Sequence, residues 1–464
     1  MIHTTPDEEI PGIVQALRDH YNTEVTRPIQ WRIQQLQGLI KVLEEHEDEW
    51  NEALNKDMGA HKFEAALLVG AVKSEIKHTI KSLPKWMEPK SLSNPWALYP
   101  GSTSVVPEPY GVVCDFIPFN YPVFLGFSSI CTILAAGNVC LFKPSSNTPA
   151  CAKLYQDLFP KYLDPEAVKV VCGPSAICNV ILKERFDFIF YTGSPAIAKG
   201  VMKAASEHLT PVLLELGGKS PVYVDKNLSI EKCAKRLVWA KIFNGGQTCV
   251  APDYCFIHQD IYDKFKAELV KAISEFYGDV ANVYNDNITH IINRRHFDRL
   301  TRAIQTSGGE ILLEGLRDPE KLYIGPTLIE NPSMDSQLMK EEIFGPILPL
   351  IKISGVEDAI KYINAHEKPL SLYVYTSDNK VLEQFTKRTS SGSVVLNDST
   401  FHVSSPEMPF GGVGNSGMGQ YHGKYGFRQL SHLKPVVTHS TMIDISQRYP
   451  PYTDGHLSLL KKFL

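Results

Sequence analysis

The fold is decided by five apolar segments: GVVCDFI (111–117), NVCLFK (138–143), VKVVCG (168–173), FDFIFYTG (186–193) and PVLLEL (211–216). The stretches between them have helical character and cover residues 122–136, 148–158, 174–183 and 195–208. Strands that alternate with helices in this way form a parallel, doubly wound α/β sheet. Ligands of such sheets bind beyond the carboxyl ends of the strands, so the residues that follow each strand are the first candidates for a site.

Other architecture surrounds this sheet. Residues 8–90 show helical periodicity, and WALYPGSTSVVPEPY (96–110) is typical of a β-hairpin that leaves the helical body and returns to it. Beyond Pro221 the strands and helices alternate again, which predicts a second α/β domain. After this domain, the glycine- and serine-rich section from residue 391 is expected to form a loop joined to an edge strand.

Composition excludes several classes of protein. The chain has 464 residues, enough for two to four domains of about 100–200 residues each, and 47 basic against 51 acidic side chains. It therefore lacks the basic excess of a nucleic-acid-binding protein. Its nine cysteines form no C-x-x-C pair, and its N-terminus carries acidic residues where a secretory signal is basic. We expect no metal site, no nucleic-acid partner and a cytoplasmic location.

One stretch is long enough to cross a membrane. Residues 116–142 contain no charged side chain, although a span needs only about 20 apolar residues. Proline, asparagine and glycine nevertheless divide this stretch into a strand, a helix and a second strand. We therefore predict a buried globular segment and no transmembrane helix.

Two motifs could bind a nucleotide. The G-x-G-x-x-G at 412–417 lacks the strand before it and the helix after it that a dinucleotide fingerprint requires, which favours a structural loop. YTGSP (191–195) ends a strand and opens a helix whose free amides could hold phosphate, but the same residues also suit any capped helix. Lys143 adds a donor at the same sheet edge, unless it is simply solvated.

The strongest catalytic candidates are a cysteine and a glutamate. Cys249 follows Asn244-Gly245-Gly246-Gln247-Thr248, whose glycines allow the backbone to approach a ligand and leave amides free for an oxyanion. Glu215 ends an apolar strand, where burial would raise the pKa of its carboxyl group as a general base requires. The alternative for Glu215 is a salt bridge to Lys219. No histidine falls in a nucleophile-elbow or metal-ligand spacing.

Seven motifs, taken together, resemble the aldehyde dehydrogenase superfamily. They are PFNYP (118–122), FKPS (142–145), YTGSP (191–195), LLELGGKSP (213–221), FNGGQTC (243–249), EEIFGPILP (341–349) and MPFGGVGNSGMG (408–419). The sequence from 409 to 427 is most similar to the class 3 branch, the fatty and aromatic aldehyde dehydrogenases.

This resemblance implies three structural parts. Residues 1–93 and 109–219 would form a Rossmann-like NAD(P)-binding domain without the glycine fingerprint, and residues 220–410 a catalytic domain. Residues 94–108 and 411–464 would form a small β-flap and a C-terminal tail, with a strand near 430–440. In the family such a flap assembles a homodimer.

Carried over position by position, the resemblance also implies catalytic roles. Cys249 would be the nucleophile and Glu215 the general base. Asn120 would hold the oxyanion together with the backbone N–H of Cys249. Phe119, where the family often has tryptophan, would change the packing beside Asn120 and leave the mechanism intact.

The implied cofactor is NAD or NADP. Lys143 would bind the adenosine ribose, and Gly193 and Ser194 would lie beside the pyrophosphate. Ser146 stands where many members have a glutamate that binds the ribose 2'-hydroxyl; because serine would not repel a 2'-phosphate, we expect NADP to be tolerated as well as NAD.

At the other end of the cofactor, Gly218 would lie close to the nicotinamide, and Glu342 and Phe344 would position its ribose and ring. The sequence thus predicts NAD(P)-dependent oxidation of hydrophobic aldehydes to acids through a cysteine thioester. The alternatives are a CoA-acylating relative and a catalytically silent binding protein of the same fold, which would be expected to have lost the cysteine, glutamate or asparagine.

Overall fold

The computed structural model describes residues 2–95, 98–444 and 446–463; residues 96–97 of the predicted hairpin, and residues 1, 445 and 464, lie outside this set. The amphipathic pattern of the N-terminal region produces four helices, α1 (Ile10–Asn22), α2 (Ile29–Glu45), α3 (Glu47–Met58) and α4 (Lys62–Met87). No described helix is both long and apolar enough to cross a lipid bilayer.

The five predicted strands form one sheet. Its strands are β3 (Val112–Phe116), β4 (Val139–Lys143), β5 (Val168–Val170), β6 (Phe188–Gly193) and β7 (Val212–Leu216), extended at the β7 edge by β17 (Gly417–Met418). The order is β17-β7-β6-β3-β4-β5, and every pairing except β17 with β7 is parallel. From β3 the chain continues to β4 and β5 on one side of the sheet, and later to β6 and β7 on the other side. The ends of β3, β4 and β6 therefore surround a topological switch point, where the direction of the strand order reverses.

The helices predicted between these strands are present: α5 (Pro122–Ala135), α6 (Pro149–Tyr162), α7 (Ile177–Ile181) and α8 (Pro195–Ser206). All residues of α5 are buried, because α5 lies between the sheet and the helices α2 and α4. The uncharged stretch at 116–142 is therefore the core of a globular sheet layer, as its punctuation predicts.

A second sheet, beyond Pro221, has the order β10-β13-β14-β9-β8-β15-β16. These strands are β10 (Glu310–Leu313), β13 (Thr327–Glu330), β14 (Ile347–Ile353), β9 (Tyr254–His258), β8 (Pro221–Val224), β15 (Ser371–Tyr375) and β16 (Ser393–Leu396). Its helices are α9 (Ile230–Ile242), α10 (Tyr262–Tyr277), α11 (Arg294–Gln305), α12 (Gln337–Lys340), α13 (Val356–Asn364) and α14 (Asn379–Arg388), with a ribbon of β11 (Arg317–Asp318) and β12 (Tyr323–Ile324).

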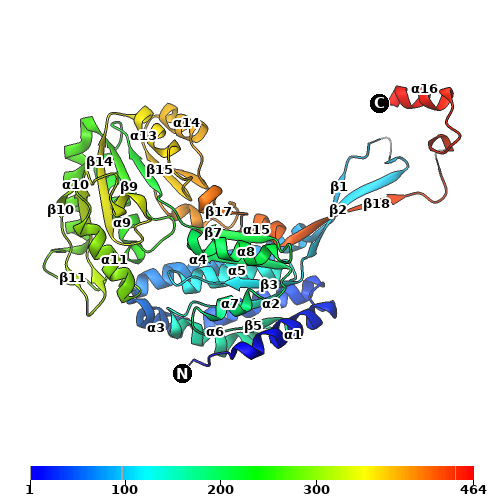
Figure 1. Ribbon diagram of the computed structural model, residues 1–464, viewed down its shortest axis with the longest axis horizontal. Coiled ribbons are helices and arrows are strands. Elements are labelled where there is room, and N and C mark those ends of the chain that lie inside the picture. The colour runs from blue at the N-terminus through cyan, green and yellow to red at the C-terminus, as the bar shows by residue number, and fades with distance from the viewer. Residues whose placement is uncertain (1, 96–97, 445, 464) are drawn as a thin grey trace.

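A third, antiparallel sheet projects from the body (Figure 1) and consists of β1 (Lys90–Leu92), β2 (Gly101–Pro109) and β18 (Ser431–His439). The hairpin thus begins earlier than its sequence suggests, at Lys90. The strand expected near 430–440 is β18, which pairs with the whole of β2. It is preceded by α15 (Gly423–Gln429) and followed by α16 (Asp454–Phe463).

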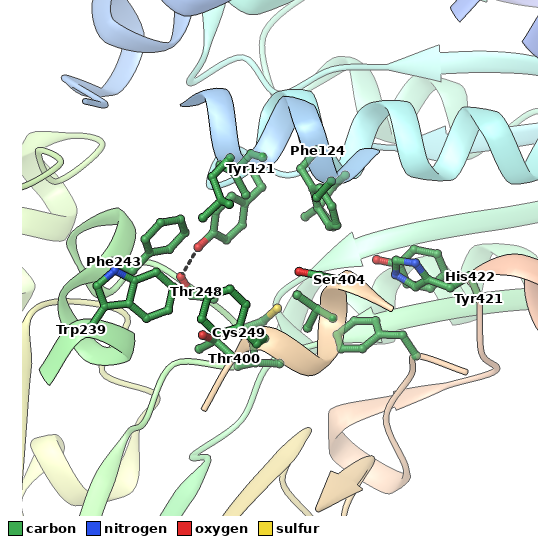
Figure 2. Close-up of a pocket in the computed structure, with 18 residues that line it drawn as sticks. Tyr121, Phe124, Trp239, Phe243, Thr248, Cys249, Thr400, Ser404, Tyr421 and His422 are labelled. Carbon is green, nitrogen blue, oxygen red and sulfur yellow. Dashed lines mark hydrogen bonds between the residues drawn. The ribbon is translucent and has the colours of Figure 1, made fainter. Parts of the chain in front are cut away.

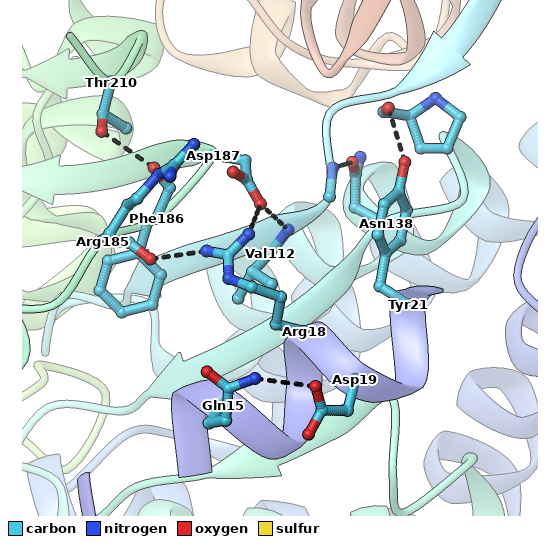
Figure 3. A network of polar contacts seen from close by, with 12 residues as sticks. Gln15, Arg18, Asp19, Tyr21, Val112, Asn138, Arg185, Phe186, Asp187 and Thr210 are labelled. Carbon is cyan, nitrogen blue, oxygen red and sulfur yellow. Dashed lines mark hydrogen bonds and ion pairs between the residues drawn. The ribbon is translucent and has the colours of Figure 1, made fainter. Parts of the chain in front are cut away.

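Polar contacts fix α1 to the amino-terminal edge of the first sheet (Figure 3). Arg18 forms an ion pair of 2.8 Å with Asp187, whose carboxylate also accepts the N–H of Val112 at 2.9 Å. Arg18 donates a further hydrogen bond to the carbonyl of Arg185. Since Val112 starts β3 and Asp187 precedes β6, α1 closes this edge and leaves the carboxyl edge for ligands.

Candidate active site

Cys249 follows a tight turn after α9 that only glycine permits. Gly245 and Gly246 have φ values of 61° and 71°, in the left-handed region. A side chain at Gly245 would lie 2.4 Å from the carbonyl oxygen of Thr289, and one at Gly246 would lie 2.3 Å from that of Gly345. The two glycines therefore let the cysteine loop pack directly against two other backbone segments.

Glu215 lies on β7 and is buried, with 1% of its surface exposed. Neither of its carboxylate oxygens has a hydrogen-bond partner among the described residues. Lys219, the partner considered from the sequence, forms its ion pair with Asp253 instead and donates to two backbone carbonyls. The structure thus excludes the salt-bridge alternative and leaves a buried carboxylate available for a proton.

The surroundings of Glu215 and Cys249 favour the protonated form of each side chain. Burial, and then the charge of Glu342, raise the pKa of Glu215 well above its usual value, and the nearby Cys249 thiol opposes the rise only in part. Burial also raises the pKa of Cys249, as do Glu215 and Glu342, whereas its own backbone N–H and that of Val250 lower it. The thiol therefore needs a proton acceptor to become a nucleophile, and Glu215 is the group beside it.

Asn120 is brought to the same loop. Its buried side-chain amide donates to the backbone carbonyl of Gln247 at 3.0 Å. The backbone carbonyl of Asn120 accepts from the Asn244 side chain at 2.8 Å. Because an amide nitrogen has two hydrogens, one remains for an oxyanion formed near Cys249.

An apolar cavity has Cys249 in its wall (Figure 2). Tyr121 lines the cavity and is also buried, with its hydroxyl 2.6 Å from that of Thr248. Other lining residues come from α4, α5, α9 and the segment around 401–403, and include Leu68, Phe124, Trp239, Phe243, Phe401 and Val403. Sequence analysis did not identify these residues, because they meet only through the tertiary fold.

The glycine motif at 412–417 is a structural loop, as predicted. Its last residue, Gly417, belongs to β17 and lies opposite Glu215 in the antiparallel pairing with β7. The two histidines of this region also make structural contacts: His402 bonds to the Ser393 hydroxyl at 3.0 Å, and His422 pairs with the buried Glu75 at 3.1 Å. His422 lines the apolar cavity as well, which the sequence did not indicate.

The adenosine side of the predicted cofactor site lies at the switch point of the first sheet. Lys143 ends β4 and Gly193 ends β6, on either side of β3. Ser194 is the N-cap residue of α8 and its side chain makes no capping bond to the helix, and Ser146 is exposed. The ammonium group of Lys143 donates to the carbonyl of Pro144 at 2.7 Å. These donors and the open amides of α8 fit a nucleotide with its phosphates.

The nicotinamide end of this site lies near Glu215. The carboxylate of Glu342 accepts the N–H of Gly218 at 3.1 Å, and burial raises the pKa of Glu342 to about 8. Phe344 has a φ of 50° and packs edge to face on Phe119, with ring centroids 5.8 Å apart. A Cβ added at Gly218 would have no neighbour closer than 3.6 Å, an ordinary contact distance, so a small side chain would fit here.

The aldehyde dehydrogenase family model matches residues 2–436. The chain is 40% identical to the dimeric, NADP-preferring aldehyde dehydrogenase of Canis lupus familiaris, over 96% of this chain and 98% of that one. Identity to the 4,4'-diaponeurosporen-aldehyde dehydrogenase of Staphylococcus aureus is 38%, over 96% of each chain.

Solved structures agree. The substrate-bound state of Staphylococcus aureus AldH superposes with a TM-score of 0.94 at 37% identity, covering 98% of this chain and 99% of that chain. The NADP complex of a Methanocaldococcus jannaschii glyceraldehyde-3-phosphate dehydrogenase has a TM-score of 0.84 at 26% identity, covering 94% and 95%. The resemblance seen in the motifs is thus confirmed, and the chain belongs to the aldehyde dehydrogenase family of NAD(P)-dependent oxidoreductases.

Proposed function

We propose that the enzyme oxidises hydrophobic aldehydes to carboxylic acids with NAD or NADP, through a thiohemiacetal and then a thioester on Cys249. One observation carries the proposal. Cys249 lies between an apolar cavity and the buried carboxylate of Glu215, whose oxygens have no hydrogen-bond partner among the described residues.

The chemistry follows from these positions. Glu215 takes the thiol proton, and the sulfur of Cys249 adds to the aldehyde carbon. The resulting oxyanion accepts hydrogen bonds from the Asn120 side chain and the Cys249 N–H, each donor contributing roughly 100- to 1,000-fold in comparable sites. A bound nicotinamide supplies the hydride acceptor for this carbon. After Glu215 has released the thiol proton to solvent, water attacks the thioester and Glu215 accepts the water proton. The acid leaves as the carbon–sulfur bond breaks, and Glu215 returns this proton to the sulfur.

For the cofactor we assign the adenosine ribose to Lys143 and the pyrophosphate to Gly193 and Ser194. Ser146 is the residue that admits a 2'-phosphate, since it carries no charge to repel one. Two relatives support use of NADP: the canine enzyme is named NADP-preferring, and the Methanocaldococcus structure contains NADP.

At the reacting end, Glu342 holds the nicotinamide ribose, and Phe344 the ring. We assign Gly218 to the backbone beside the nicotinamide ring. The hydrogen bond from the Gly218 N–H to Glu342 supports this assignment by joining the two segments.

The projecting sheet supports a homodimer as the functional unit. Its edge strand β18 exposes the apolar side chains of Leu433, Val436 and Val437, and exposed strand edges and apolar patches are typical of association sites. Accordingly we assign residues 94–108 and 411–464 to the flap and tail, 1–93 with 109–219 to the cofactor domain, and 220–410 to the catalytic domain. We place the enzyme in the cytoplasm because all nine cysteines are free.

The test is an assay of the purified chain with each cofactor and aliphatic or aromatic aldehydes, following absorbance of the reduced nicotinamide. We expect turnover with equal release of acid, unaffected by CoA. Reduced nicotinamide that formed only with CoA, with acyl-CoA released in place of acid, would instead favour the acylating alternative, against which Glu215 argues. A protein without turnover for any aldehyde would be a silent member of the family, although Cys249, Glu215 and Asn120 are all retained.

A further inference from the structure

A carboxylate outside the proposed reaction reaches the loop that carries Cys249. Glu64 lies in the first turn of α4, and its two oxygens lie 3.4 and 3.3 Å from the backbone N–H of Asn244, which donates to them. The hydroxyl of Thr289 donates to the same carboxylate at 3.0 Å. Asn244 has a φ of 56°, an uncommon conformation for a residue other than glycine, so a fixed acceptor for its N–H stabilises the turn.

Further hydrogen bonds connect Asn244 to Asn120, the proposed oxyanion donor. The Asn244 side chain donates to the carbonyl of Asn120 at 2.8 Å and to that of Gln247 at 3.3 Å. The Asn120 amide donates to the same Gln247 carbonyl, two residues before Cys249. Two residues thus separate Glu64 from the oxyanion site, and all of these bonds lie in the interior.

The segment 289–292 makes a second set of contacts with the cysteine loop. The carbonyl of Thr289 faces Gly245 closely, and Gln247 exchanges hydrogen bonds with the carbonyl of His290 at 2.8 Å and the N–H of Ile292 at 3.0 Å. Because Glu64 binds both Asn244 and Thr289, it joins the cysteine loop to the neighbouring segment that contains Thr289.

Glu64 does not line the apolar cavity of Cys249. It lines a neighbouring space together with Asn120 and Asn244, and Cys249 does not line that space, so Glu64 touches neither the aldehyde nor the reacting sulfur. We propose that Glu64 is a positioning residue, whose carboxylate holds the Cys249 loop and the Asn120 amide in their catalytic arrangement. This inference rests on the proposed function for its activity readout.

The carboxylate should lose this role as the pH falls. Burial raises the pKa of Glu64 to about 7, opposed by the Thr289 hydroxyl and the Asn244 N–H. The titratable groups that face it are Tyr121 from α5 and Tyr277 from α10, and burial raises the pKa of both phenols. A carboxylate accepts from both donors, whereas its protonated form has a hydroxyl that must donate. The loop is therefore best held above pH 7.

The experiment compares Glu64→Ala and Glu64→Gln with Asp57→Ala and Asp57→Asn. Asp57 is a matched control, because its partly buried carboxylate also accepts backbone N–H bonds, from Ala150 and Cys151, but does not touch the Cys249 loop. At pH 8 we expect Glu64→Ala to lower kcat by about 10- to 100-fold with little change in the KM for the cofactor. Glu64→Gln, whose amide mimics the protonated acid, should lower it by up to about tenfold. The Asp57 variants should keep the wild-type kcat.

The pH dependence of kcat/KM tests whether Glu64 must be ionised. Groups common to both enzymes cancel in the ratio of wild-type to Glu64→Gln kcat/KM, so only Glu64 changes this ratio. It should fall by up to about tenfold between pH 8 and pH 6, as expected for a group that titrates near 7. A constant ratio, together with equal kcat losses for Glu64→Ala and Asp57→Ala, would overturn the inference.

Alkylation of Cys249 by iodoacetamide, without aldehyde or cofactor, provides a readout independent of turnover. The ordered loop directs two backbone N–H groups at the sulfur, which favour the thiolate. Glu64→Ala should therefore slow the labelling and Asp57→Ala should not. If Glu64→Ala is labelled more slowly but the wild type oxidises no aldehyde, the proposed function is refuted and the role of Glu64 is not. If the wild type is active and Glu64→Ala is labelled at the wild-type rate, the role of Glu64 is refuted. If Glu64→Ala fails to fold, the pH ratio of Glu64→Gln decides.

Discussion

The two regions that meet at Cys249 differ in how they recognise a ligand. On one side is a cavity walled mainly by aromatic and aliphatic side chains such as Phe124, Trp239 and Phe401. On the other, Glu342 and Gly218 offer a carboxylate and a backbone segment, and Lys143 lies further along the sheet edge. The difference indicates that the aldehyde is selected by buried apolar area and the cofactor by placed hydrogen bonds, with Cys249 and Glu215 at the boundary.

Removal of the sulfur at this boundary should have the largest effect. Cys249→Ser is expected to lower kcat by at least about 1,000-fold, because a hydroxyl is a far weaker nucleophile than a thiolate. The measurement is reduced-nicotinamide formation with a saturating aldehyde. Cys233→Ala, which removes a buried thiol from α9, is the control and should retain most of the activity. Comparable losses in both variants would show that the sulfur of Cys249 has no special role.

Loss of the base should come next. Glu215→Gln is expected to slow steady-state turnover by about 100- to 10,000-fold. The first turnover should be less affected, because a thiol can lose its proton to solvent, whereas water attack on the thioester has no other nearby acceptor. In the wild type, activity should fall as the pH decreases through the raised pKa of Glu215, because only the ionised carboxylate accepts a proton. Stopped-flow measurement of the burst and the steady state separates the two steps. Equal slowing of both would place Glu215 in thiol activation alone.

A change on the polar side should affect one cofactor and spare the other. Ser146→Glu is expected to reduce kcat/KM for NADP by about 10- to 100-fold through repulsion of the 2'-phosphate, with NAD little changed. Ser146 is exposed, so the substitution should fold normally. Paired initial-rate assays measure the effect. A wild-type enzyme that already prefers NAD by several hundredfold would contradict the role given to this serine.

Changes on the apolar side should be smaller and graded. Each methylene added to a straight-chain aldehyde should raise kcat/KM by about fourfold, the equivalent of about 0.8 kcal/mol, until the cavity is filled. The increase should be weaker in Phe401→Ala, which shortens one wall. Initial rates for a homologous aldehyde series provide the test. A series without length dependence would mean that the cavity is not the aldehyde site.

Elements whose sequence patterns lie within a few residues could be predicted, whereas elements that depend on distant contacts could not. The five strands of the first sheet and the glycine turn before Cys249 have patterns within a few residues, and they appear where expected. In contrast β16 could not be located within the section expected to contain an edge strand, because that section is rich in serine. The helix α15 could not be predicted, because it begins and continues with glycine. Both form through tertiary packing, against β15 and against α4 and α5 respectively.

The same limit applies to the site. Cys249, Glu215 and Asn120 stand beside turns that mark them in the sequence. The cavity wall has no such marker, because Leu68, Trp239 and Val403 come from three distant segments. Glu64 was also missed, since an isolated glutamate in a first helical turn is ordinary, and only its contacts with Asn244 and Thr289 distinguish it.

The most direct test of the account is to trap the acyl group. Glu215→Gln, mixed with an aldehyde and NAD, should accumulate a thioester that intact and peptide mass spectrometry locates on the peptide containing Cys249, with the mass of the aldehyde less one hydrogen replacing the thiol proton. Reduced nicotinamide that forms while Cys249 stays unmodified, or an acyl group found on another cysteine, would contradict the central claim.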